Sequence, residues 1–179
     1  MAQTRLPDPV LLVVAAFSRH MDLLEEAARQ LEDLFSPIDL ESVPYAFTQT
    51  SYYAASMGTD LKKQFFVFSR LIAPESLADA KLRTNELEQA VAARQVYPES
   101  RPLNLDPGIL SLGKFMLATT KDQSHRIYLH SGIYAEVTLR FQAGTYEPWT
   151  WTYADYRQPE VIAFLNSARD FYRQKLRTD

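Results

Sequence analysis

The stretch VLLVVAAF, residues Val10–Phe17, decides the fold, because it is continuously apolar and rich in β-branched side chains. A run of this kind is typical of a strand that is covered on both faces in the middle of a sheet. Between Met21 and Phe35, apolar side chains recur at three- and four-residue steps, which predicts an amphipathic helix that ends before Pro37. The chain therefore opens as a buried strand followed by a helix.

Later apolar runs predict a mixed α+β protein. Helices are expected from Pro74 and from Pro159, because proline is favoured at the first position of a helix. Strands are predicted at 38–48, 64–72, 103–112, 114–121, 125–130, 133–141 and 147–153. The first elements follow the order βαββαβ of a ferredoxin-like fold. We therefore expect one domain over residues 1–179, with a ferredoxin-like core at 1–112 and an antiparallel β-meander plus a C-terminal helix at 113–179.

The composition indicates a folded protein without thiol chemistry. Of the 179 residues, 46% are hydrophobic and 23% are charged, so the chain can bury a core. It has no cysteine, which excludes disulfides, thiolate metal sites and thiol nucleophiles. The net charge of −3 argues against DNA binding, because DNA-binding domains usually carry a basic face. Residues 101–179 nevertheless carry 10 basic and 8 acidic side chains, so an anion would prefer this half.

The apolar run Val10–Phe17 is too short to cross a bilayer. It also lacks the basic leader and the small-residue cleavage site of a secretory signal, since Arg5 is offset by Asp8. We therefore expect a cytoplasmic protein with no membrane partner.

Residues Gly108–Phe115 (GILSLGKF) match the glycines and the lysine of a phosphate-binding P-loop and then depart from it. The motif requires serine or threonine after its lysine, because that hydroxyl binds Mg²⁺, and Phe115 occupies the position. The interior of the segment is bulky, and the residues after Lys114 alternate like a strand where a P-loop continues into a helix. We therefore expect two strands interrupted at Gly113, with no true P-loop.

Several segments together resemble one protein family. They are NLDPG at Asn104–Gly108, followed by GKF, ATTKD, HRIYL and GIYAEVTL. This combination resembles an uncharacterised bacterial family, domain of unknown function 4416 (DUF4416), and the resemblance runs almost from end to end of the chain. It implies no established activity, although members of the family are sometimes labelled GTP-binding.

The segment from Lys114 to Arg140 predicts a polar sheet face that can hold a ligand. Strand side chains alternate between two faces, so the aliphatic residues of this segment can all turn to the core. The opposite face then carries Lys114, Thr120, Arg126, Tyr128, His130, Tyr134, Glu136, Thr138 and Arg140. The same pattern is also typical of the solvated side of a two-layer sheet. As a site, this face would bind a small anionic or nucleotide-like ligand.

The expected ligand-binding residues combine cations with aromatic rings: Lys114, Lys121, Arg126, Tyr134, Tyr52 and Tyr53. Lysine and arginine pair with phosphate or carboxylate groups, and the long loop 49–61 is expected to cover the ligand with its tyrosines. The sequence does not decide whether the protein is an enzyme. Acid–base or group-transfer chemistry would use Glu136 or His125 to move a proton.

No metal site is predicted from the histidines. His125 and His130 are five positions apart, and an odd separation points side chains to opposite faces of a regular strand. The cofactor stays unassigned. Mg²⁺ could accompany a phosphorylated ligand, since such sites need only one or two protein carboxylates.

Two other functions remain open. One is a non-catalytic assembly or regulatory module, in particular a homodimer, which needs a broad exposed apolar patch. The other is single-stranded RNA binding by Trp149, Trp151 and Tyr153, which alternate along the predicted edge strand. These rings could instead pack the strand against the last helix. A small-ligand site needs the charged groups to converge on one cavity.

Overall fold

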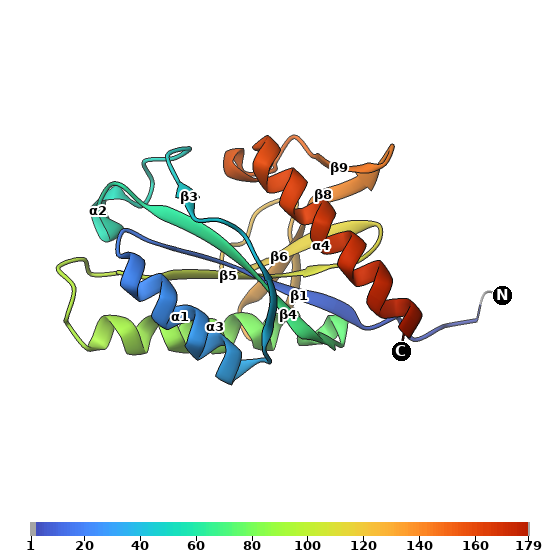
Figure 1. Ribbon diagram of the computed structural model, residues 1–179, viewed down its shortest axis with the longest axis horizontal. Coiled ribbons are helices and arrows are strands. Elements are labelled where there is room, and N and C mark those ends of the chain that lie inside the picture. Colours follow the sequence, from blue (N-terminus) through green and yellow to red (C-terminus); the bar gives the residue numbers. More distant parts are fainter. Residues whose placement is uncertain (1–2, 179) are drawn as a thin grey trace.

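Residues 3–178, which the computed structural model describes, form a nine-stranded antiparallel sheet with α-helices on both of its faces (Figure 1). The strands are β1 (Val10–Ser18), β2 (Ile38–Glu41), β3 (Tyr45–Ala46), β4 (Lys62–Ile72), β5 (Asn104–Leu110), β6 (Lys114–Thr119), β7 (Ile127–His130), β8 (Ile133–Gln142) and β9 (Thr145–Pro148). The helices are α1 (Met21–Leu34), α2 (Ala54–Met57), α3 (Leu77–Ala93) and α4 (Pro159–Thr178), with short 3₁₀ turns at Pro74–Ser76 and Ala154–Arg157. The α+β class predicted from the sequence is confirmed.

The strand order along the sheet is β2-β4-β1-β5-β6-β8-β7, with β3 paired to β4 and β9 paired to β8. Every neighbouring pair is antiparallel. Strand β1 lies between β4 and β5, and each of its residues is buried. The prediction of a central strand at Val10–Phe17 is therefore confirmed.

Alternate residues of β1 belong to two separate apolar cores. Leu12 and Val14 pack with residues of α1 and α3, whereas Leu11 and Val13 pack with residues of α4. Figure 1 shows the same division, with α1 and α3 below the sheet and α4 running across its other face. Because both faces of the central strand are covered, an unbroken apolar run is what this position requires. Among the described residues, no helix combines the length and the apolar character needed to cross a membrane.

Two predicted strands differ from the observed ones. The expected strand 38–48 is divided into β2 and β3, which pair separately with β4. The expected edge strand 147–153 ends at Pro148, because Thr152 folds the following residues into a turn. Its Oγ1 accepts a hydrogen bond from the backbone N–H of Trp149 at 2.8 Å and donates one to the carbonyl of Thr138 at 2.5 Å. Trp149, Trp151 and Tyr153 therefore do not share the face of a strand.

A bulge between β6 and β8 changes which side chains share a face. Phe115 lies opposite Leu139 and Leu117 lies opposite Glu136, so two steps along β6 correspond to three along β8. Thr138 is the extra residue. Glu136 consequently joins Phe115 and Leu117 on the side of the sheet that α4 covers, where it is 2% exposed. The regular alternation expected for 133–141 is not observed, and Glu136 is not on a solvated face.

A substitution at Gly108 tests how closely β5 packs against β6. A Cβ at this buried position would lie 2.6 Å from the carbonyl oxygen of Met116 and 2.7 Å from Cζ of Phe115. We predict that Gly108→Ala lowers the free energy of unfolding by about 1–3 kcal/mol, the usual effect of forcing an extra methyl group into a packed interior. Urea unfolding would measure the change.

The matched control is Gly113→Ala, since a Cβ at Gly113 meets no atom within 4 Å. This variant should differ from wild type by less than about 0.5 kcal/mol. Equal unfolding midpoints for the two alanine variants would contradict the tight contact at Gly108.

Candidate functional site

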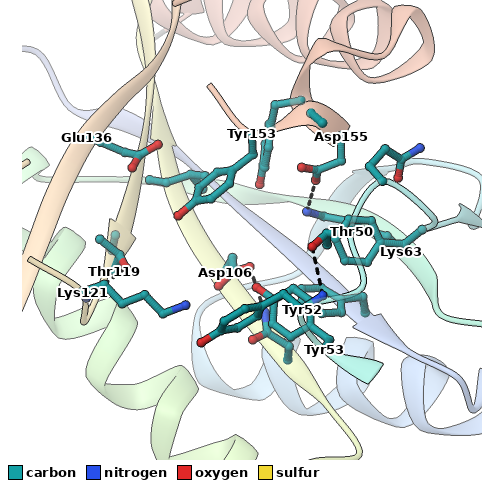
Figure 2. A pocket seen from close by; sticks show the side chains of 18 of the residues that line it. Thr50, Tyr52, Tyr53, Lys63, Asp106, Thr119, Lys121, Glu136, Tyr153 and Asp155 are labelled. Atoms are coloured by element: carbon teal, nitrogen blue, oxygen red, sulfur yellow. Dashed lines mark hydrogen bonds and ion pairs between the residues drawn. The ribbon is translucent and has the colours of Figure 1, made fainter. Parts of the chain in front are cut away.

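A cavity of about 390 Å³ lies on the α4 side of the sheet, where β5 and β6 separate (Figure 2). The two strands pair only from Gly108 to Leu110 of β5, so residues 104–107 have β1 as their single strand neighbour. Residues of the segments 47–53 and 153–156 form further walls. The volume lies in the range of small-molecule sites. The cavity is thus a consequence of incomplete pairing within the sheet.

Lys121 lies at the exposed end of the cavity, where its Nζ is 4.0 Å from the centre of the Tyr52 ring. Tyr52 is 65% exposed, and the hydrogen bond and the charge of Lys121 lower the pKa of its hydroxyl. None of the ion pairs within residues 3–178 uses Lys121. The mouth of the cavity, defined by Lys121 and Tyr52, therefore carries a positive charge that no neighbouring carboxylate compensates.

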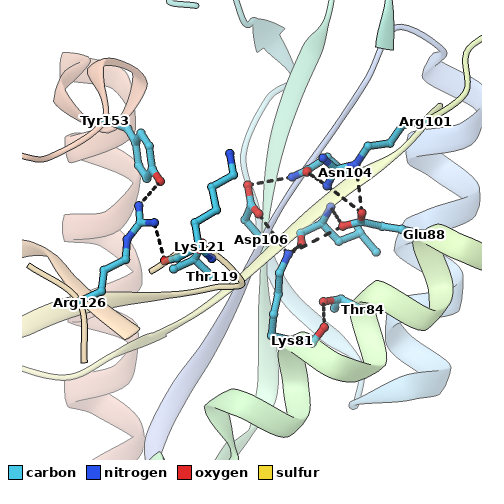
Figure 3. Close-up of polar contacts among 11 residues, drawn as sticks. Lys81, Thr84, Glu88, Arg101, Asn104, Asp106, Thr119, Lys121, Arg126 and Tyr153 are labelled. Atoms are coloured by element: carbon cyan, nitrogen blue, oxygen red, sulfur yellow. Dashed lines mark hydrogen bonds and ion pairs between the residues drawn. The ribbon is translucent and has the colours of Figure 1, made fainter. Parts of the chain in front are cut away.

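Arg126 and Glu136 form a buried ion pair at one wall. Nε of Arg126 donates to Oε2 of Glu136 at 2.8 Å, and both side chains are 1% exposed. Arg126 also donates to the hydroxyl of Tyr153 at 2.6 Å and to the backbone carbonyl of Lys121 at 2.8 Å (Figure 3). Nε2 of His125 lies 3.2 Å from the same Glu136 oxygen. Arg126 therefore fixes both the carboxylate of the wall and the backbone that carries Lys121.

Lys63 and Asp155 form a second buried ion pair. Nζ of Lys63 donates to Oδ2 of Asp155 at 2.6 Å, and the two side chains are 3% and 6% exposed. The same nitrogen lies 4.5–5.5 Å from the centres of four aromatic rings, which belong to Phe17, Phe47, Phe65 and Tyr156. Aromatic faces attract cations. The ammonium group is thus held in an aromatic enclosure with one carboxylate as its counter-ion.

A third polar group lies between α3 and β5 (Figure 3). Nζ of Lys81 donates to the carbonyl of Leu105 at 2.7 Å and to Oδ1 of Asp106 at 3.3 Å. Glu88 accepts the backbone N–H of Leu105 at 2.7 Å and a hydrogen bond from Arg101 at 2.8 Å. Burial raises the pKa of Glu88, against the opposing effect of the two cations. This network presents the Asp106 carboxylate to the cavity with its charge already compensated.

The interior of the cavity combines charged groups with aromatic rings, and its charges are nearly balanced. Asp106, Glu136 and Asp155 line it, and each is paired with a cation of the protein. Burial raises the pKa of the Tyr53 and Tyr153 hydroxyls, which therefore stay protonated and can donate hydrogen bonds. Within residues 3–178, no three histidine, aspartate or glutamate side chains are grouped so that they could hold a metal ion. The walls can thus hydrogen-bond a polar ligand with both donors and acceptors.

The structure brings together some of the residues predicted from the sequence. Tyr52, Tyr53, Lys121 and Glu136 line the cavity, although they come from three different segments. His125 and Arg126 are not lining residues but contact Glu136 directly.

Lys114 and Tyr134 are not brought to this cavity. Lys114 is next to Phe115 in β6, so its side chain lies on the opposite face of the strand. There it lines a separate, mostly apolar hollow of about 510 Å³. Tyr134 packs edge-on against Tyr128, with ring centres 5.3 Å apart. The prediction that Lys114, Arg126 and Glu136 share one face is therefore wrong, because the bulge turns Glu136 to the side of the sheet that α4 covers.

The sequence interpretation did not assign several lining residues to the site, among them Lys63, Asp106, Tyr153, Asp155 and Tyr156. Lys63 precedes the apolar run of β4 and has the position of a residue at the exposed end of a strand. Its partner Asp155 is 92 positions away, so no local pattern connects them. The one available signal is a lysine two positions before the aromatic residues of a predicted buried strand.

The fold and the cavity define an α+β protein with a small-molecule-sized cavity, lined by charged and aromatic side chains, beside a split in its sheet. Residues 8–172 match the family model described as Domain of unknown function (DUF4416). The match covers most of the 179 residues, so the chain belongs to this family, as the resemblance of its segments predicted. No curated protein and no solved structure matches the chain.

Lys63→Met tests the buried pair at the cavity wall. Removal of the ammonium group leaves the carboxylate of Asp155 buried without its counter-ion, and we predict a loss of about 3–5 kcal/mol in the free energy of unfolding. Lys63→Met/Asp155→Asn removes both charges and should recover more than half of that loss. Urea unfolding of both variants measures the difference.

Lys114→Met is the control for this comparison, because Lys114 is an exposed residue of the same sheet. It should change the unfolding free energy by less than about 0.5 kcal/mol. The buried pair would be refuted by a Lys63→Met protein that is as stable as the Lys114→Met protein.

Proposed function

We propose that the cavity binds a small anionic, nucleotide-like ligand. The observation that carries this proposal is the contrast between Lys121 and the buried cations. Lys63, Lys81 and Arg126 each have a carboxylate partner, whereas Lys121 at the mouth has none within residues 3–178. A phosphate or carboxylate group of the ligand would supply that missing counter-ion.

The remaining walls suit a ligand that carries a polar organic part. The rings of Tyr52 and Tyr53 pack edge-on with their centres 5.0 Å apart, and both line the cavity. Thr119 and Thr120 add hydroxyl groups beside Lys121. The carboxylates and protonated phenols offer hydrogen bonds to heteroatoms and not to hydrocarbon. A nucleotide-like molecule combines an anionic group with a ring that carries such heteroatoms.

Acid–base or group-transfer chemistry would extend this proposal. Glu136 lines the cavity, and its Oε2 contacts both Arg126 and His125. A proton would move between a bound ligand, Glu136 and His125, while Arg126 and Lys121 would stabilise negative charge. Mg²⁺ would take part only if it arrives with a phosphorylated ligand, as one or two carboxylates then suffice.

We also propose that residues 1–112 form a ferredoxin-like core within one cytoplasmic domain. The strand order β2-β4-β1-β5, with every neighbour antiparallel, supports this assignment. Helices α1 and α3 pack in the same apolar core on one face, as the βαββαβ arrangement requires. Residues 113–179 then extend the sheet as a β-meander and add α4.

A homodimer is the second candidate, and β7 favours it. This strand ends the sheet, and its residues Ile127, Tyr128 and Leu129 are 71%, 56% and 37% exposed. An exposed apolar edge strand can pair with another chain. Analytical ultracentrifugation over a range of protein concentrations would show whether the chain associates. RNA binding has less support, because Trp149 and Trp151 stack with their ring centres 5.1 Å apart, so each ring covers one face of the other.

Lys121→Gln tests the ligand proposal. The probes are inorganic phosphate, ribose 5-phosphate and the nucleoside 5′-monophosphates, each with and without Mg²⁺, in a thermal-shift assay. At least one probe should raise the Tm of the wild-type protein, since a ligand at a hundred times its Kd adds about 2.7 kcal/mol of stability. In Lys121→Gln its affinity should fall about tenfold or more, as expected for a lost hydrogen bond to a charged group.

Lys114→Gln is the matched control, because it removes an equal charge outside the cavity. Its Tm should rise with the probe as far as that of the wild type. The proposal fails if no probe shifts the wild-type protein, or if the two glutamine variants respond equally.

A further inference from the structure

The inner wall of the cavity holds hydrogen-bond donors that the protein does not use. An ammonium group has three N–H donors, yet Lys63, which is 2% exposed, makes a single hydrogen bond within residues 3–178. The hydroxyl of Tyr156, another lining residue, is buried and has no hydrogen-bond partner in the same part of the chain. Nζ of Lys63 lies 4.5 Å from the centre of the Tyr156 ring, so the two side chains pack together in the same wall. Native proteins rarely leave buried donors unsatisfied.

Lys81 shows what a buried lysine of the same cavity looks like when its role is structural. It is 5% exposed and also lines the cavity. Its Nζ lies 2.7 Å from the carbonyl of Leu105, 3.3 Å from Asp106 and 3.9 Å from Glu88. Three oxygen atoms surround that ammonium group, against one for Lys63. The difference indicates that an oxygen from outside the chain belongs at Lys63.

We propose that the inner wall is a subsite for a neutral oxygen acceptor of the ligand, a carbonyl or a hydroxyl oxygen, which Lys63 and Tyr156 bind together. The inference rests on the proposed function, because the same ligand places its anionic group at Lys121. Figure 2 shows Lys121 and Lys63 extending into the cavity from different sides. The ligand class is therefore a small acid with an oxygen group at its far end, of which an oxo-purine nucleotide is one example.

The charges near Lys63 decide that this acceptor is neutral. Asp155 already compensates the ammonium group at 2.6 Å, and a second anion would have to enter beside this carboxylate. Desolvation of an additional charge at a buried, already neutral pair is unfavourable. Burial raises the pKa of Tyr156 well above its usual value, so its hydroxyl stays protonated and available as a donor.

Inosine and adenosine 5′-monophosphate are the test pair, because they share ribose and phosphate and differ at one edge of the purine ring. Position 6 is an oxo group in the first and an amino group in the second. Isothermal titration calorimetry on the wild-type protein should show the inosine nucleotide binding at least about tenfold more tightly, the effect of one hydrogen bond to a charged donor.

Tyr156→Phe is the informative variant, because it removes only the unpartnered oxygen. Without a ligand its Tm should equal or exceed that of the wild type, since no internal hydrogen bond is lost. Its preference for the inosine nucleotide should shrink severalfold, with the affinity for the adenosine nucleotide unchanged. Tyr172→Phe is the control: this hydroxyl donates to the carbonyl of Pro9 at 2.7 Å, outside the cavity, so its loss should lower the Tm and leave the preference intact.

Each outcome decides the proposal. Equal affinities for the two nucleotides, or a preference that Tyr156→Phe does not reduce, overturns the subsite. The proposed function survives this result if either nucleotide or ribose 5-phosphate binds and requires Lys121. If none of these probes binds, both proposals fail. A ligand-free Tyr156→Phe protein that melts below the wild type would show that the hydroxyl has an internal role, and would also overturn the subsite.

Discussion

The burial of β1 on both faces is the constraint on which the rest of the structure depends. It requires apolar cover on each side of the sheet, which α1 and α3 provide on one side and α4 on the other. The cover by α4 reaches Leu11, Val13 and Ala15 but not Phe17, which packs instead with Phe47 and other residues of the 47–61 region. The cavity forms in this last part of the sheet, where loops take the place of a helix.

Buried ion pairs hold two irregular segments of the cavity wall in place, the 3₁₀ turn at Ala154–Arg157 and the β6–β7 connection. Lys63 of β4 is bonded to Asp155 of the 3₁₀ turn, and Arg126 joins the β6–β7 connection to Glu136 and Tyr153. Buried ion pairs often add little net stability compared with apolar packing, because desolvation opposes their attraction. Their effect here is positional: each pair ties an irregular segment to a strand. The walls of the cavity are thus fixed by the protein itself, which would reduce the entropy lost on binding the proposed ligand.

The sequence predicted those features that depend on neighbours along the chain. The strand at Val10–Phe17, the helix from Pro159 and the break between the strands predicted at 125–130 and 133–141 all follow from local patterns. That break is the turn Ser131-Gly132, where the positive φ angles of 51° and 78° explain why a glycine is present. The sequence could not predict the bulge at Thr138, because the extra residue is visible only against the partner strand. Regular alternation therefore assigned Glu136 to the wrong face.

The same distinction applies to the site. Lys121, Tyr52 and Tyr53 were predicted because a lysine at the end of a strand and tyrosines in a long loop are typical of binding surfaces, and all three line the cavity. The pair Lys63 and Asp155 could not be found, because its meaning depends on a contact across 92 positions. Ionisable residues are usually exposed, so a buried lysine is identified only from the packed structure.

In the proposed function, the exposed and the buried ends of the cavity would contribute differently to recognition. Lys121 stands at the mouth in contact with water, where ionic attraction is weakened by the high dielectric constant and screened by salt. Such a charge speeds the encounter with an anion and distinguishes little between one anion and another. Lys63 and Tyr156 lie in a surrounding of low dielectric constant, where a satisfied hydrogen bond is strong and an unsatisfied one is costly. In the proposed function, attraction to the mouth would therefore be common to many anions, and selection among them would fall to the inner wall.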